Sequence, residues 1–371
     1  MSKGKNKGEW SELYVFAKIL SERNLVGADE YLVPIFGENY PVLKILRNSK
    51  NVRRTYDLGD GSSILVRVEE SGEITEEHQI SNEVLEEAIP KILSAIKGGK
   101  GAFEMLDGSE FALKLSAGNI KTNATKKGDI QIVVYDKVTS MPSAVEFSIK
   151  SYIGALPTLV NSSQLTNFTF CAESFSGSID KINEIETKAK FQDRTKAVIA
   201  SCKELRFVEV ESPTFVSNLR KIDSKMPEII SQYLLAFNSS GITSLEALTQ
   251  HLIDSKNIDP ITGYGVTFEE LKYKIKQLFL NFALGMVARY EWDGFIKADG
   301  GYIIVKESGE IVCFHIYNIS QLSEYLFNNT QLQNYGTKSK YGMLYKEGGE
   351  VRFKLNLNVR FTKPQAPPET N

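Results

Sequence analysis

The stretch GDIQIVVYDKVTSMPSAVEFSIK (128–150) decides which fold the sequence predicts. Two apolar runs rich in Val, Ile and Phe begin and end it, and they extend over 128–136 and 144–153. The connection KVTSMPS contains the Ser and Pro residues that turns favour. We therefore predict two neighbouring strands that pair as a hairpin.

The second strand of this hairpin has one polar and one apolar face. Side chains alternate between the two sides of a strand, so Glu146, Ser148 and Lys150 share the polar face. Asp129 opens the first strand, and the hairpin brings it beside that face. Two carboxylates and one ammonium are thus expected to meet at the edge of a sheet.

This set of groups suits metal-assisted hydrolysis of a phosphodiester. Mg²⁺ is bound by few carboxylates and keeps several waters. The ion acidifies a water and neutralises charge on the phosphate. Lys150 can orient the water and stabilise the transition state as a point charge. The alternative is that Glu146 and Lys150 form a solvated pair on an amphipathic strand.

The N-terminal segment GEWSELYVFAKILSE (8–22) has apolar residues at helical spacing and predicts an amphipathic helix. Glu9 and Glu12 lie on or beside its apolar stripe. A carboxylate that faces a core is costly unless a group pairs with it, so these residues are further candidate metal ligands. The alternative, strongest for Glu9, is a helix-start carboxylate stabilised by the helix dipole.

Composition excludes several classes of protein. The chain of 371 residues has a net charge of −2, so any nucleic-acid site must be a local patch. Its three cysteines form no CxxC pair and its three histidines lack metal-ligand spacing, which argues against zinc. The apolar run at 278–288 is too short to span a bilayer. We expect a cytoplasmic protein without a membrane partner, because the first residues also lack the apolar core of a signal peptide.

The C-terminal segment VRFKLNLNVRF (351–361) alternates without interruption, which predicts a strand of about 36 Å. Its polar face carries Arg352, Lys354, Asn356, Asn358 and Arg360. Arg and Asn match the hydrogen-bonding edges of bases, whereas Lys and the outer Arg suit phosphates. We predict a DNA-reading strand. The alternative is an ordinary strand with a solvated face.

Polar residues also follow Lys150 directly, at Ser151, Thr158, Asn161 and Asn167. Together with Ser148 they are candidates for holding phosphates or bases near the cut. Turn chemistry is the alternative reading of this segment. The basic loop with Lys50, Arg53 and Arg54 is a further place where the DNA backbone could be clamped.

The remaining chain completes a mixed α/β (α+β) pattern. We expect strands at 41–47 and 63–68 with a charged loop between them, a helix at 80–97 that Pro90 kinks or breaks, and a hairpin or strand pair at 102–115. Further along we expect a loop or short helix at 154–170, helices through about 180–290 with a capping box at Thr267 and Glu270, and a hairpin at 300–318. The predicted fold is a central mixed sheet flanked by helices, with an additional helical and β C-terminal part.

Four regions follow from this pattern. They are an N-terminal helix plus catalytic core at 1–175, a mainly helical region at 176–295, a β-rich DNA-recognition region at 296–362 and a disordered tail at 363–371.

Asp129 and the run from Glu146 to Lys150 resemble the PD-(D/E)xK nuclease motif. KGEWSE (7–12) is similar to the KGxxxE start of the first helix in resolvase-like members, where the Glu joins the metal site, and this favours Glu12. The sequence has Gly128 where the motif often has Pro, and Ser148 where it usually has an acid. In some restriction enzymes a carboxylate from elsewhere fills that gap, and Glu146 and Glu12 are both candidates.

Three blocks resemble the HpaII-type family of type II restriction endonucleases. They are NKGEWSELYVFAKIL, FSIKSYIGALPTLVNSSQLTNF and FKLNLNVRF. The resemblance implies a restriction-endonuclease-like core and Mg²⁺-dependent cleavage of double-stranded DNA at a short palindrome, by family analogy CCGG cut after the first C. It also implies a homodimer within a restriction-modification system. A structure-specific resolvase or repair nuclease, and a DNA-binding protein with a decayed nuclease site, remain the alternatives.

Overall fold

The computed structural model describes residues 4–49, 51–59, 61–117, 128–137, 139–334 and 341–367. The chain forms two compact units. The first comprises Met1–Pro157, Ile296–Tyr325 and Lys363–Asn371, and the second comprises Thr158–Phe295 and Leu326–Thr362. Residues 296–325, which the sequence pattern grouped with the C-terminal region, thus belong to the same unit as the N-terminal helix.

The first unit is built on a mixed sheet that has nine strands within the described residues. In spatial order they are β2 (Asn24–Ala28), β14 (Ile311–His315), β13 (Gly301–Val305), β9 (Met141–Ser151), β8 (Ile130–Asp136), β3 (Pro34–Ser49), β4 (Val52–Asp57), β5 (Ser63–Glu70) and β6 (Glu73–Ser81). The predicted hairpin is confirmed, since β8 and β9 pair in antiparallel fashion with Ile130 opposite Phe147. The predicted central mixed sheet is confirmed as well, because β13 joins β9 in parallel.

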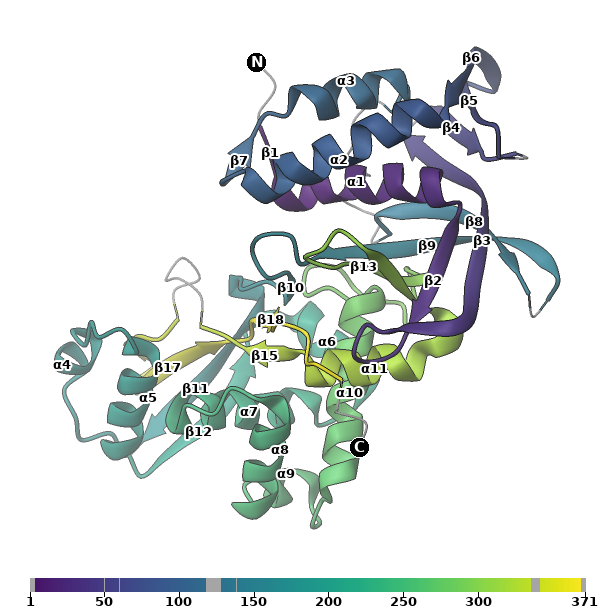
Figure 1. Ribbon diagram of the computed structural model, residues 1–371. Helices are drawn as coiled ribbons and strands as arrows, with labels where there is room; N and C mark the ends of the chain where they lie inside the picture. Colours follow the sequence, from purple (N-terminus) through teal and green to yellow (C-terminus); the bar gives the residue numbers. More distant parts are fainter. Residues whose placement is uncertain are drawn as a thin grey trace. The chain divides into compact units, whose positions relative to one another are not determined.

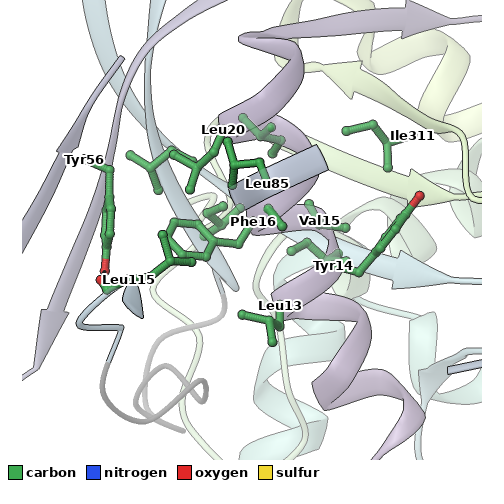
Figure 2. Packing of buried hydrophobic residues seen from close by; sticks show 14 of the residues in the cluster. Leu13, Tyr14, Val15, Phe16, Leu20, Tyr56, Leu85, Leu115 and Ile311 are labelled. Carbon is green, nitrogen blue, oxygen red and sulfur yellow. Dashed lines mark hydrogen bonds between the residues drawn. The ribbon is translucent and has the colours of Figure 1, made fainter. Parts of the chain in front are cut away.

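Helices cover one face of this sheet. They are α1 (Lys7–Glu22), α2 (Asn82–Gly98) and α3 (Leu106–Lys114), with the short strands β1 (Lys5–Asn6) and β7 (Ala102–Phe103) beside them (Figure 1). Leu13, Phe16 and Leu20 of α1 are fully buried. Figure 2 shows them among side chains of the sheet and of α2, including Tyr56 and Leu85. Each such side chain stabilises the fold by about 1.5–3 kcal/mol through its burial, which fixes α1 against the sheet.

The expected hairpin at 102–115 is wrong, because this segment forms α3. Asp107 and Gly108 lie inside the helix and not at a turn. A Cβ at position 108 would stand 2.6 Å from Sδ of Met105 and 3.1 Å from the ring of Trp10. The glycine therefore serves close packing, and Phe111 supplies the buried face of the helix.

A smaller expectation also fails. The charged segment between the strands at 41–47 and 63–68 is not a loop, since it contains β4, which buries Tyr56 and lets its hydroxyl donate to the Leu115 carbonyl at 3.0 Å. Of the kink or break predicted at Pro90, the break does not occur, because Pro90 lies within α2 and the helix continues to Gly98.

The second unit contains two small sheets in its described part. One has the order β10 (Thr158–Val160), β18 (Val359–Phe361) and β15 (Thr330–Leu332), and the other has the order β12 (Glu204–Val210), β11 (Asn167–Glu173), β17 (Glu350–Asn356) and β16 (Leu344–Glu347). The segment 154–170, expected as a loop or short helix, thus holds β10, a 3₁₀ turn at Gln164–Thr166 and the start of β11.

The helices between these strands confirm the expected helical region, apart from β12. They are α4 (Ile179–Asn183), α5 (Lys190–Ala200), α6 (Pro213–Ile222), α7 (Met226–Ser240), α8 (Leu245–Asp254), α9 (Asp259–Thr262) and α10 (Phe268–Leu284). The capping box at the start of α10 is present, with the Thr267 amide donating to Glu270 Oε2 at 2.8 Å. Helix α11 (Ile319–Asn328) precedes β15 in the chain.

The unbroken C-terminal strand predicted over 351–361 is wrong. The chain forms β17 and β18, which belong to different sheets. Between them the amide of Leu357 donates to the Thr166 carbonyl at 2.9 Å, and the side-chain amide of Asn358 donates to the Gln333 carbonyl at 3.0 Å. The Asn358 side chain thus stabilises the segment that connects the two sheets. The alternating sequence pattern does not predict this role.

No helix among the described residues is long and apolar enough to cross a membrane. The expectation of a disordered tail concerns 363–371, of which residues 368–371 lie outside the described part of the chain.

Candidate functional site

Asp129 lies where the hairpin argument placed it, beside the polar face of β9. Its amide donates to the Phe147 carbonyl at 2.8 Å. Its Oδ2 accepts a hydrogen bond from the Ile149 amide at 2.6 Å and another from the Ser148 hydroxyl at 3.1 Å. Two donors on one carboxylate oxygen fix the orientation of the group.

Lys150 lies on β9, one residue after Ile149. Burial lowers the pKa of its ammonium, and the negative charges of Asp129 and Glu12 partly oppose that shift. Both carboxylates therefore act on the same ammonium. Its Nζ lies 6.0 Å from the ring centroid of Tyr302 on the neighbouring strand β13. A desolvated lysine beside carboxylates is a group that proton transfer and phosphate chemistry both use.

Glu146 stands at the other end of the polar face. Its amide donates to Asp299 Oδ1 at 2.7 Å. A Cβ at Gly128 would lie 2.5 Å from Oε2 of Glu146, so the glycine leaves room for that side chain. This accounts for Gly128 where the nuclease motif often has Pro, because a proline ring would collide with the glutamate.

The two glutamates of the first helix have different positions. Glu9 is the N3 residue of a capping box, in which its Oε2 accepts from the Asn6 amide at 2.8 Å and its own amide donates to Asn6 Oδ1 at 3.0 Å. The helix-start interpretation of Glu9 therefore describes the structure. Glu12 lies one turn later, and its charge acts on Lys150 and on Arg47.

Among the described residues no three His, Cys, Asp or Glu side chains converge to hold a metal ion. Asp129, Ser148 and Lys150 lie together, but the structure does not gather the predicted ligands Asp129, Glu146 and Glu12 as one group. Mg²⁺ needs only one or two carboxylates, with waters and substrate phosphate completing its shell. The anchored Asp129 carboxylate fits that requirement with a hard oxygen ligand.

Two residues of the site were missed by sequence reasoning. Tyr302 and Asp299 lie on or just before β13, which pairs with β9 so that Tyr302 is opposite Ser148. The apolar run GGYIIV predicted the strand itself. Strand β9 is far away from β13 in the chain. The parallel register that places Tyr302 beside Ser148 and Lys150, and Asp299 at the Glu146 amide, has no local sequence signal.

The residues expected to read DNA are distributed over several environments. Asn167, Asn356 and Asn358 are 1–5% exposed. The Asn356 side chain donates to Asn167 Oδ1 at 2.6 Å. Arg352 pairs with Glu347 at 2.5 Å, and Lys354 pairs with Glu211. The polar face of β17 is thus largely buried or neutralised by carboxylates within the protein.

Most of the residues near Lys150 that were predicted to contact DNA also have partners within the protein. Ser148 is 5% exposed and supports Asp129. The Ser151 hydroxyl accepts from the Ser11 hydroxyl of α1 at 3.0 Å. Asn161 is exposed directly after β10. In the basic segment, the Arg54 guanidinium donates to the Ser116 carbonyl at 2.6 Å, and Lys50 lies outside the described residues.

Thr158 and Arg360 do share a face. They are directly opposite each other on β10 and β18, and Gln331 of β15 is directly opposite Arg360 on the other side. Directly opposed residues in antiparallel strands project to the same side. All three are partly exposed, whereas Val359 and Leu332 beside them are buried. The three-stranded sheet therefore presents a row of hydroxyl, guanidinium and amide groups.

Comparison with known proteins gives a consistent match over nearly the whole chain. The model of the HpaII restriction endonuclease family matches residues 6–361. The type II restriction enzyme HpaII of Haemophilus parainfluenzae is 32% identical over 360 residues, which cover 96% of this chain and 98% of that protein. No solved structure matches the chain.

Proposed function

The chain belongs to the HpaII restriction endonuclease family and is a site-specific deoxyribonuclease, and from this premise we propose that it hydrolyses double-stranded DNA with Mg²⁺ at a short palindrome. By analogy within the family, the site is CCGG, cut after the first C. One observation supports the location of the chemistry above the others. Asp129 is held by two donors of β9, on the strand that carries Lys150.

Asp129 is the first metal ligand in this proposal, and Glu12 or Glu146 supplies the second carboxylate. Bound Mg²⁺ would supply Lewis-acid stabilisation of the charge on the phosphate. Glu12 is favoured by its action on Lys150, and Glu146 by its place on the same face of β9. Glu9 is not assigned a ligand role, because its carboxylate closes the capping box.

Lys150 orients the attacking water and can take its proton. Burial lowers its pKa, which brings the neutral amine closer to the working pH than an exposed lysine would be. In its charged form it stabilises the negative charge that grows on the phosphate oxygens. Tyr302 limits the space that the long side chain can explore, since its ring lies 6.0 Å from Nζ.

We assign base or phosphate contacts to the row of Thr158, Arg360 and Gln331. Arginine pairs bidentately with guanine and glutamine with adenine, and both also bind phosphates. A palindromic target is read by two copies of the chain related by a two-fold axis. A homodimer acting on DNA is therefore part of the proposal. We also place the protein in the cytoplasm.

The test is digestion of a sequenced plasmid by the wild type and by Lys150→Ala, each with Mg²⁺ and with EDTA. We expect discrete fragments that require Mg²⁺ and disappear in the variant, and their ends give the recognition site and stagger. A variant that still retards the DNA on a gel would show that only catalysis is lost. If the wild type binds the plasmid but leaves it intact under all conditions, a decayed nuclease site replaces this proposal.

A further inference from the structure

We propose that Tyr302 and Ser148 form a positioning relay that fixes the Asp129 carboxylate, so that position 148 supports a metal ligand and does not supply one. This inference rests on the proposed function, since it assigns Asp129 to the metal. It also gives a reason for the serine that stands where the nuclease motif usually has an acid.

The relay is built across three neighbouring strands or strand ends. Tyr302 of β13 is directly opposite Ser148 of β9, and the Ser148 hydroxyl donates to Asp129, the residue just before β8. Tyr302 and Ser148 are 1% and 5% exposed, so water does not compete for their hydroxyls. Hydrogen bonds in such surroundings hold geometry more firmly than exposed ones.

The direction of the hydrogen bonds follows from counting protons. The Ser148 hydroxyl has one proton, and it is donated to Asp129 Oδ2, 3.1 Å away. Because that proton is already used, we infer that the phenol of Tyr302, the register partner of Ser148, donates to the serine oxygen. Burial, together with the charge of Asp129, raises the pKa of the phenol, which keeps its proton in place.

An acid at position 148 would conflict with this arrangement. A carboxylate there would put a second negative charge about where the Ser148 hydroxyl now meets Asp129 Oδ2. In the metal-free protein two carboxylates at such a distance do not both ionise readily, so one of them holds a proton until a cation binds. The serine avoids this repulsion, because its hydroxyl donates a hydrogen bond to the Asp129 carboxylate.

The function of the relay is to leave the second oxygen of Asp129 in a fixed position. Oδ2 is occupied by the Ile149 amide and by Ser148. Within the described residues Oδ1 of Asp129 makes no hydrogen bond. Because Oδ2 is held by two donors, Oδ1 is also fixed in its orientation toward a metal ion. Groups that hold a ligand in this way commonly change metal affinity by about 10–100-fold when they are removed.

The experiment compares Ser148→Ala, Ser148→Thr, Ser148→Asp and Tyr302→Phe in the full-length chain. Tyr233→Phe is the matched control, because Tyr233 is a buried tyrosine whose hydroxyl bonds to the Thr249 hydroxyl at 2.6 Å. One readout is Mn²⁺ binding to the protein alone, followed by electron paramagnetic resonance. The others are the Mg²⁺ concentration that half-saturates single-turnover cleavage, and the melting temperature.

We expect Ser148→Ala to weaken Mn²⁺ binding and raise the Mg²⁺ requirement by about tenfold, and Tyr302→Phe to do so by about threefold. Ser148→Thr keeps the hydroxyl and should stay within about twofold of the wild type. Ser148→Asp should bind Mn²⁺ more weakly than the wild type. The Tyr233→Phe control should change the melting temperature without changing either metal readout.

Three outcomes overturn the relay. The first is an Asp variant at 148 that binds Mn²⁺ as tightly as the wild type or more tightly, which would make the position a ligand site. The second is a Tyr302→Phe variant that cannot be told from Tyr233→Phe in both metal readouts. The third is a wild type that neither binds Mn²⁺ nor cuts DNA, which removes the proposed function together with the relay. In the first two cases the wild type still cuts, so the proposed function stands.

Discussion

The Ile149 amide lies 2.6 Å from Oδ2 of Asp129, so the backbone beside Lys150 directly holds the carboxylate that we assign to the metal. The two groups of the proposed chemistry are therefore linked through one residue of β9. Their separation depends on the register of the β8–β9 hairpin. A slip of one residue would turn Lys150 to the other side of the sheet.

Asp129→Asn tests the charge of this carboxylate with little change in shape. The amide oxygen can still accept from the Ile149 amide, so the melting temperature should stay close to that of the wild type. Single-turnover cleavage should fall by more than about 100-fold, the range in which a single group that stabilises transition-state charge acts. Cleavage within about threefold of the wild type would remove Asp129 from the metal site.

Substitution of the two helix glutamates separates a ligand from a cap. Glu12→Gln should reduce cleavage at low Mg²⁺ and recover partly at high Mg²⁺, because it removes a carboxylate proposed as the second metal ligand. Glu9→Gln is the matched control, since a glutamine at N3 still closes a capping box. Equal loss of cleavage in both variants would argue that the start of α1, and not Glu12 itself, matters.

Local periodicity was enough to predict the centre of the first unit. Strict alternation gave the β8–β9 hairpin and the shared face of Ser148 and Lys150, because strand geometry depends only on neighbours in the chain. The parallel pairing that brings Tyr302 to this face joins segments about 150 residues apart, and its register depends on the packed sheet.

The same periodicity misled where packing overrides it. Alternation through Asn356 and Asn358 predicted one strand, yet the structure uses both amides to satisfy buried backbone and side-chain groups at a crossing between sheets. Gly108 similarly suggested a turn, although its missing Cβ makes room for Met105. In each case the residue packs against or bonds to a side chain or carbonyl that strand or turn periodicity does not predict.

Arg360→Ala and Gln331→Ala test the row on the three-stranded sheet. Both should weaken binding of duplex that contains the cleavage site, by about 1–3 kcal/mol if the group reads a base. A phosphate contact would instead weaken all duplexes alike and reduce the salt dependence of binding. Gln277→Ala on α10 is the control, since Gln277 is a partly exposed glutamine on a helix of the same unit. Unchanged affinity in both test variants would place recognition elsewhere.

Arg194 is expected to hold the second unit together. Its guanidinium is 1% exposed and donates to the carbonyls of Ile185, Gly342 and Asn183 at 2.7–3.0 Å. Lysine cannot reproduce this fork, and buried carbonyls would lose their donors. Arg194→Lys should lower the free energy of unfolding by about 2–4 kcal/mol in urea.

The control for this prediction is Arg206→Lys. Arg206 is an arginine with 48% side-chain exposure that pairs with Glu173, and its substitution should cost less than about 1 kcal/mol. A similar loss in both variants would mean that Arg194 contributes no more than a surface ion pair.

His315 should make the first unit less stable as the pH falls. The residue is 4% exposed, stacks on Tyr40 at 4.4 Å and accepts from the Tyr317 amide at 3.3 Å. Burial lowers the pKa of its imidazole below the ordinary value of 6.5, and the charge of Asp136 opposes this only in part. The unfolded chain therefore binds a proton at a pH where the folded chain does not. Stability is fully present above 6.5 and is lost as the pH falls through the lowered value.

The measurement is the free energy of unfolding at about pH 7 and about pH 5. His315→Gln should start from a lower stability, because the ring contacts are lost, but should lose less on acidification than the wild type. His251→Gln, on α8 of the other unit, is the control for replacing a histidine outside the first unit. If the two variants lose equal stability between these pH values, protonation of His315 does not contribute to the acid sensitivity of the fold, and carboxylates must account for it.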